Sequence, residues 1–356
     1  MRLVDRIAQC RRPFVVQNST TRALTRLNGA ADFASEMARC PMRFVLSDEL
    51  TRLCTALAYS KGARQLVCAD LLHVPAESVW IEWCDAAWLT ELQRYGFKFP
   101  ASDLKGLGHR GALIRASRDG RRGLIRTFWT VGSANPEVLA SSMEAYFDLD
   151  TPEGEEPAAP DAQDLATRRV TASIEGEPDI MRRYFRFRYE RSWADYYQRA
   201  MLSRQTEAAI AHDALSNIAA DIPMLLAFFL LLATRNGLPR RPHVLERLNR
   251  ARARSGKVPL LDHIEVLSPV LPEHDGAGGN ESINGRRAPR LHHVRGHLVR
   301  RGSELFWRVP HLRGNARSGV VRTRTVTWTI DRPVSGHLDR RPPSGNEITE
   351  QLMPAG

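Results

Sequence analysis

The stretch ALIRASRDGRRGLIRTFWTV, residues 112–131, indicates the fold class of this chain. Residues 112–116 and 123–131 are rich in apolar and β-branched side chains, and Asp119-Gly120 lies between these two runs. An Asp-Gly pair between apolar runs is a strong signal for a β-hairpin. The stretch therefore predicts two antiparallel strands joined by a turn at residues 118–121.

A second strand signal lies upstream, in VWIEW at residues 79–83. Because successive side chains of a strand point to opposite faces, Val79, Ile81 and Trp83 share one face. Trp80 and Glu82 share the other face. This run predicts a short strand that precedes the hairpin in the same domain.

Residues 20–62 are predicted to be helical. Ser47 has the chemistry of a helix N-cap, and Asp48 and Glu49 follow it in the first turn. Apolar residues then recur at helical spacing from Leu50 onward. Helices and strands together predict an α+β domain over residues 1–150.

The middle of the chain has a different composition. Residues 127–167 contain nine acidic residues and no Lys or Arg, so 151–169 are expected to form an acidic linker. Residues 170–271 are expected to be mostly helical, apart from a strand near 185–189 that alternates Phe and Arg. The longest apolar run, Met224 to Ala233, has ten residues, whereas a bilayer span needs about 20. We therefore expect a buried helix, no membrane partner and a cytoplasmic protein.

The charge of the chain is concentrated in one segment. The net charge is +11, and residues 235–330 hold 19 basic and seven acidic groups. A field of one sign on this scale attracts polyanions such as DNA or RNA. The basic residues are 47 Arg and four Lys, a bias that a GC-rich genome also produces, so the clustering is more informative than the abundance.

Within the basic segment, residues 291–314 read LHHVRGHLVRRGSELFWRVPHLRG. Two strands are predicted around a turn at Gly302-Ser303, which places Val294 opposite His311. A two-stranded ribbon fits a nucleic-acid groove, and Arg binds phosphate through two hydrogen bonds. The predicted nucleic-acid contacts are Arg295, Arg300, Arg301, Trp307, Arg308 and Arg313. The alternative is that these arginines pair with acidic residues elsewhere in the chain, including the acidic run.

The same segment holds the candidate catalytic residues His293, His297 and His311. On a strand, His293 and His297 are about 13 Å apart, which is too far to share one metal ion. The predicted register brings His311 next to His293, a pair able to serve as acid and base. Two polar residues on a sheet face are the ordinary alternative, and no metal site is predicted.

No cofactor motif stands in a suitable context. Gly106, Gly108 and Gly111 spell G-x-G-x-x-G, but this motif leads into a strand, whereas the dinucleotide fingerprint opens a helix. The five cysteines lie in the first 84 residues and form no C-x-x-C pair, which favours reduced thiols over a zinc site. No cofactor is therefore expected.

Three motifs near the C-terminus carry a resemblance. They are GKVPLL at 256–261, VRGH at 294–297 and WRVPHLRG at 307–314. In this order they resemble a family of proteins from tailed bacteriophages and integrated prophages, in which a GKPPL-like motif follows a basic helix. In that family a VRGH strand then pairs with a WxxPHxRG strand. Val258 stands where that family has Pro. The resemblance implies a phage or bacterial setting and implies no mechanism.

The predicted architecture is α+β, with a mixed N-terminal domain, a helical middle and a C-terminal antiparallel β-hairpin module. After residue 271 we expect a flexible loop at 272–290, a basic hairpin module at 291–331 and a disordered tail at 332–356. The function expected first is nucleic-acid binding by an accessory factor that is not an enzyme. The alternatives are a histidine- or metal-dependent nuclease and a protein–protein or virion-associated role.

Overall fold

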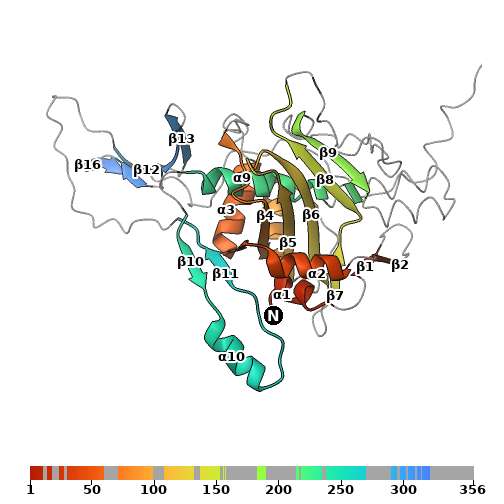
Figure 1. Ribbon diagram of the computed structural model, residues 1–356. Coiled ribbons are helices and arrows are strands. Elements are labelled where there is room, and N and C mark those ends of the chain that lie inside the picture. The colour runs from red at the N-terminus through yellow and green to blue at the C-terminus, as the bar shows by residue number, and fades with distance from the viewer. Residues whose placement is uncertain are drawn as a thin grey trace, which may run out of the picture.

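The chain forms an α+β structure, as predicted: helices pack on a large mixed sheet (Figure 1). The computed structural model describes residues 1–10, 14–17, 24–27, 30–59, 71–98, 108–131, 137–152, 155, 157, 183–189, 214–215, 218–234, 238–269, 290–294, 297–301, 304–308, 311–313 and 315–320. The predicted loop at 272–290, apart from Arg290, the strand expected at 320–330, apart from Val320, and the tail lie outside these residues. So does most of the predicted linker at 151–169.

The main sheet has eleven strands, nine of which follow one another in a single path. In spatial order the path is β10 (Arg240–His243), β11 (His263–Val266), β3 (Met42–Leu46), β4 (Ser78–Cys84), β5 (His109–Ala116), β6 (Arg122–Val131), β7 (Glu137–Ala140), β1 (Phe14–Gln17) and β2 (Leu24–Leu27). Off this path, β8 (Met143–Asp148) pairs with β6, and β9 (Phe185–Tyr189) pairs with β8. The pairs β11–β3, β3–β4 and β1–β7 are parallel, and the others are antiparallel.

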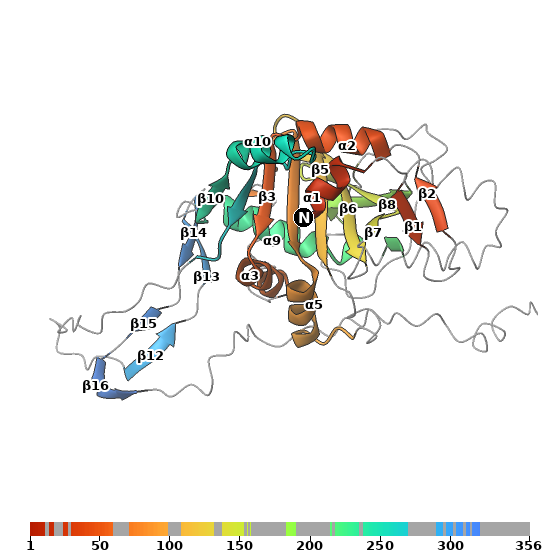
Figure 2. The ribbon, with the colours of Figure 1, turned by 90° about the horizontal axis from the view of Figure 1, so that it is seen from below.

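Helices cover both faces of the sheet (Figure 2). Helices α1 (Leu3–Ala8) and α2 (Ala30–Arg39) lie on one face, and α3 (Asp48–Ala58) and α5 (Asp85–Arg94) lie on the other. Helix α9 (Ile222–Leu232) packs against α3 and places Phe228 5.6 Å from the ring of Phe44. The core therefore has two layers of side chains, one on each side of the sheet.

Strand β4 contributes buried side chains to both layers of the core. Val79, Ile81 and Trp83 point to one face, as the alternation predicted, and all three are fully buried. Trp80 and Glu82 point to the other face and are also fully buried, because α1 covers them. A strand buried on both faces belongs to the centre of a sheet, and β4 lies between β3 and β5.

The predicted hairpin around Asp119-Gly120 is confirmed. Strands β5 and β6 pair antiparallel, with Ile114 opposite Ile125 and Ala116 opposite Gly123. Gly120 has φ +72°, and a Cβ there would lie 2.1 Å from the carbonyl oxygen of Val74, so only glycine fits the turn.

The prediction of helix throughout residues 20–62 was partly wrong. Ser47 does cap a helix: its hydroxyl accepts from the amide of Leu50 at 3.2 Å. However, Leu24–Leu27 and Met42–Leu46 are strands. The second of these lies between β4 and β11 and pairs on both sides, and its Phe44 and Val45 are residue types that favour a strand.

Segments from the predicted helical middle region join the same sheet. Strand β9 pairs with β8, with Phe185 and Tyr189 buried as the alternating pattern predicted. Strand β11 pairs in parallel with β3, although the two are separated by more than 200 residues. The apolar run forms the buried helix α9, in which Pro223 occupies the first turn. A turn at residues 220–221 divides this helix from the helical residues before it. The structure thus places strands from both sides of the predicted linker in one sheet.

Among the described residues, no helix has the length and apolar character needed to span a bilayer.

Candidate nucleic-acid interface

The C-terminal segment forms the predicted ribbon. Strands β13 (His297–Arg301) and β14 (Glu304–Arg308) pair antiparallel, and Arg301 lies opposite Glu304. Strands β12 (Arg290–Val294) and β15 (His311–Arg313) continue the same register, with Val294 opposite His311 as predicted. Strand β16 (Asn315–Val320), which the sequence did not predict, pairs in parallel with β12.

Four of the predicted arginine contacts lie on the surface of this ribbon. Arg300, Arg301, Arg308 and Arg313 are exposed, whereas Arg295 lies outside the described residues. The Arg301 guanidinium lies 5.9 Å from the ring centre of Phe306.

Trp307 has a different environment from these arginines. Its side chain is 4% exposed and packs in the core with Leu298, which lies opposite it, and with Leu305. The indole was predicted to contact nucleic acid, but in this arrangement its ring is covered and cannot stack on a base. Trp307 is therefore a core residue in this structure.

The register separates the three candidate histidines. His293 lies opposite Leu312, and His297 lies opposite Arg308. His311 lies opposite Val294, the residue that follows His293, so the two histidines belong to adjacent pairs of the ladder and not to one pair. No group of three potential metal ligands occurs in the part of the chain that the structure describes.

A second basic element extends from the edge of the sheet. Strands β10 and β11 leave the body as an arm that ends in α10 (Glu246–Arg254) (Figure 1). None of the side chains of α10 is buried. The sequence predicts a basic helix at 244–254 that contacts nucleic acid together with the hairpin, and the structure confirms the helix, although its arginines were not named individually as contacts.

Hydrogen bonds hold α10 in place without a hydrophobic core. The side-chain amide of Asn249 accepts from the Leu260 amide and donates to the Leu260 carbonyl, both at 2.8 Å. The carboxylate of Asp262 accepts from the Leu245 amide at 2.7 Å, at the start of the helix. These contacts tie the helix to its own return segment, so the arm is an ordered element.

The arm is also fastened to α1. The Leu261 amide donates to the buried carboxylate of Asp5 at 2.8 Å, and the Gln9 side chain donates to the Pro259 carbonyl at 3.3 Å. In addition, the Arg43 guanidinium donates to the Asp262 carbonyl at 3.2 Å. The direction in which α10 points is therefore set by the body of the protein.

The charge of the arm is mostly uncompensated. Residues 238–269 contain seven basic and three acidic groups. Glu246 pairs with Arg250 on the helix, and Glu265 accepts from His243 at 3.0 Å and from Arg241 at 3.4 Å. Four exposed cations have no ion-pair partner within the described ranges: Arg240, Arg247, Arg254 and Lys257.

Two histidines stack at the base of the arm. The rings of His243 and His263 lie 4.8 Å apart and are nearly parallel. Burial lowers the pKa of His263, and this effect is larger than the opposite effect of the hydrogen bond to the Leu261 carbonyl. The ring is therefore neutral at pH 7. The hydrogen bond from His243 lowers the pKa of Glu265. The histidine pair is thus neutral at His263, and Arg247, Arg254 and Lys257 lie beyond it on the arm.

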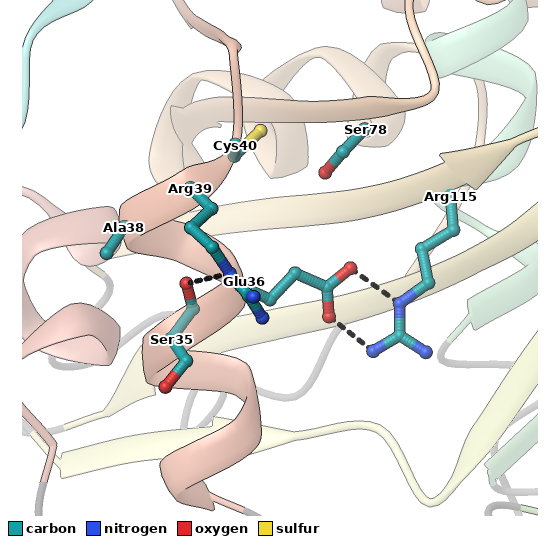
Figure 3. A pocket seen from close by; sticks show the side chains of 7 residues that line it. All are labelled: Ser35, Glu36, Ala38, Arg39, Cys40, Ser78 and Arg115. Atoms are coloured by element: carbon teal, nitrogen blue, oxygen red, sulfur yellow. Dashed lines mark hydrogen bonds and ion pairs between the residues drawn. The ribbon is translucent and has the colours of Figure 1, made fainter.

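A pocket of about 880 Å³ lies between α2 and the sheet (Figure 3). Its charged groups compensate one another, because Glu36 and Arg115 form a two-pronged ion pair across it. Burial raises the pKa of the Cys40 thiol in its wall, which keeps the thiol neutral. These contacts support a structural role for the pocket more than anion binding.

The acidic residues nearest the predicted linker have partners other than the ribbon. Asp148 pairs with Arg122 at 3.2 Å, and Asp150 pairs with Arg121 at 2.6 Å. Both arginines belong to the turn region of the β5–β6 hairpin. The described part of the acidic run therefore neutralises this hairpin. Pairing of these acidic residues with the arginines of the ribbon, the alternative expected from the sequence, is not seen among the described residues.

Comparison with protein families, with curated proteins and with solved structures found no match to this chain. The functional argument therefore depends on geometry and charge.

Proposed function

We propose that this protein binds nucleic acid through the arm and the C-terminal ribbon. The single observation that carries the proposal is helix α10, which has no buried side chain, four arginines and a fixed direction away from the sheet. An exposed basic helix fits the width of a DNA major groove, and its guanidinium groups can bind phosphates. The exposed arginines of the ribbon add a second cationic surface.

This binding is expected to depend steeply on salt. Each phosphate neutralised by a cation changes the slope of log K against log salt by about 0.9 for duplex DNA. Replacing Arg247, Arg250 and Arg254 by Ala removes three cations from α10 and no buried contact. The slope should therefore become shallower by roughly 3 if each of them contacts a phosphate.

Fluorescence anisotropy with labelled random-sequence duplex DNA, single-stranded DNA and RNA tests the proposal. The matched control replaces Arg121 and Arg122 by Ala, since these arginines are already paired with aspartates. The Arg300→Ala/Arg301→Ala variant tests the ribbon separately. Absence of binding at low ionic strength, or equal salt slopes in the α10 and control variants, would refute the proposal.

One observation favours a second candidate, a protein partner that docks on the arm. The exposed large apolar side chains among the described residues are Met1, Val244, Leu248 and Val258, and the last three lie on the arm. Such side chains contribute to protein interfaces when they cluster. A Val244→Ser/Leu248→Ser variant distinguishes the candidates: nucleic-acid binding should survive it, whereas docking of a protein should be lost.

A further inference from the structure

Three residues with complementary chemistry meet on one face of strands β4 and β5. Cys84 lies directly opposite His109 in the antiparallel register. Glu82 precedes Cys84 by two positions and therefore lies on the same face. The sequence does not show this group, because its members are up to 27 positions apart and form no motif.

The register also indicates how close Cys84 and His109 are. The Asp85 amide donates to the Gly108 carbonyl at 3.1 Å, so the adjacent pair, 85 with 108, is the hydrogen-bonded one. Cys84 and His109 then form a non-hydrogen-bonded pair, in which the side chains approach most closely. Their Cβ atoms are expected to be about 4.5–5.5 Å apart, which lets the sulfur reach the imidazole.

Glu82 faces the imidazole at ion-pair distance, although the contact with Nδ1 does not have the geometry of a hydrogen bond. His109 Nδ1 lies 3.4 Å from Glu82 Oε1. The carboxylate is fully buried and is held by the amides of Leu3 at 2.9 Å and Val4 at 3.0 Å, and by the indole of Trp80 at 3.3 Å. A carboxylate facing Nδ1 favours the tautomer with the proton on Nδ1, which leaves Nε2 as the base.

Cys84 is accessible, unlike two of the other thiols. Cys84 is partly exposed, and the His109 side chain is 46% exposed. Cys40 and Cys54 are buried, and burial raises the pKa of both thiols. Cys84 is also the N-cap residue of α5, where its side chain makes no capping hydrogen bond. The first amides of a helix have no partner within it. The Asp85 amide donates to Gly108, so the amides that follow it are the ones able to stabilise negative charge on the sulfur or on a bound oxygen.

We infer that Cys84 is a nucleophilic thiol with His109 as its general base and Glu82 as a positioning residue, acting on acyl groups attached to a good leaving group. The thiol proton moves to His109 Nε2 while the sulfur attacks the carbonyl carbon. The bond to the leaving group then breaks, and the leaving group takes the proton from His109. Water, deprotonated by His109, hydrolyses the thioester, which releases the acid and restores the thiol. This inference is independent of nucleic-acid binding.

Alkylation of the native full-length protein by iodoacetamide at a fixed pH tests the role of the base. The rate at each cysteine is measured by peptide mass spectrometry in the wild-type and His109→Gln proteins. We expect the rate at Cys84 to fall by about 100-fold, within the range that a general base contributes. His73→Gln changes an exposed histidine elsewhere and should leave the rate unchanged. A fall of less than about tenfold at Cys84 overturns the inference.

The buried thiols report the fold in the same samples. Cys40 and Cys54 should stay unlabelled in every variant that remains folded. If His109→Gln unfolds, acetylation of the wild-type protein by p-nitrophenyl acetate decides the matter. An acetyl group on Cys84 and a burst of nitrophenolate that Cys84→Ser abolishes support the inference. Absence of acetyl-Cys84 overturns it.

A Glu82→Gln variant tests the positioning role. The amide oxygen of Gln can still accept from the Leu3 or Val4 amide, but the negative charge beside His109 is lost. With Cys40 and Cys54 still protected, the rate at Cys84 should fall. An unchanged rate at Cys84 would assign Glu82 to the capping of α1 alone.

Discussion

Arg110 provides the sharpest test of how helices α5 and α9 are held against the sheet. Its guanidinium is 7% exposed and donates to Asp85 at 3.1 Å and to Asp221 at 3.1 and 3.3 Å. It also lies over the rings of Trp88, at 4.7 Å, and Trp129, at 5.2 Å. One cation therefore joins the start of β5, the end of β6 and the first turns of α5 and α9.

The electrostatic balance of this group favours the charged form. Burial acts to lower the pKa of Arg110, but the carboxylates of Asp221 and Asp85 outweigh burial and raise it above its ordinary value. Replacement of Arg110 by Ala would leave two buried carboxylates without their cation. Removing one partner of a buried ion pair costs about 3–5 kcal/mol, so we expect Arg110→Ala to lose about 4 kcal/mol of unfolding free energy.

Urea unfolding followed by tryptophan fluorescence measures this loss. The matched control is Arg122→Ala, which removes an exposed arginine from the same sheet and should change the unfolding midpoint far less. Adding Asp85→Asn and Asp221→Asn to Arg110→Met should recover part of the loss, because the two carboxylates that Arg110 contacts are then neutral amides. Equal midpoints for Arg110→Ala and Arg122→Ala would refute the reasoning.

Three further predictions concern stability. Burial lowers the pKa of His263, so as the pH falls the unfolded state binds a proton before the folded state does. The free energy of unfolding should therefore fall as the pH decreases below the ordinary pKa of 6.5 and level off below the folded pKa. Chemical denaturation should show this loss in the wild-type protein and not in His263→Phe. Gly111→Ala would place a Cβ 2.3 Å from Trp80 Cζ2 and should lose about 1–3 kcal/mol, measured by urea unfolding. Ser47→Ala removes the cap of α3 and should lose about 1 kcal/mol, whereas Ser47→Asp should retain most of the stability.

Gly111, the last glycine of the G-x-G-x-x-G pattern, occupies a closely packed strand position. This glycine lies within β5, and the indole of Trp80 occupies the space beside its Cα. The strand at this position was predicted from the sequence, and the structure confirms it. The close approach to Trp80 could not be predicted, because it depends on the pairing of β4 with β5.

The candidate interface was predicted only in part. The pairing of Arg301 with Glu304 and that of Val294 with His311 follow one register, which the sequence predicted from the spacing of the two strands. Alternation alone does not tell which face of a ribbon meets the core. Trp307 was therefore assigned to the surface, whereas it packs with Leu298 and Leu305.

The sequence by itself determined the features that depend on neighbouring residues: the Asp-Gly hairpin, the Ser47 cap, the alternating strands and the basic, coreless helix α10. Short-range hydrogen bonds and side-chain periodicity set these features. The tertiary structure alone decided that β11 pairs with β3, that Glu82 is buried beneath α1 and that Cys84 faces His109. These contacts join segments distant in sequence, and their free energy comes from burial and pairing that no local pattern records.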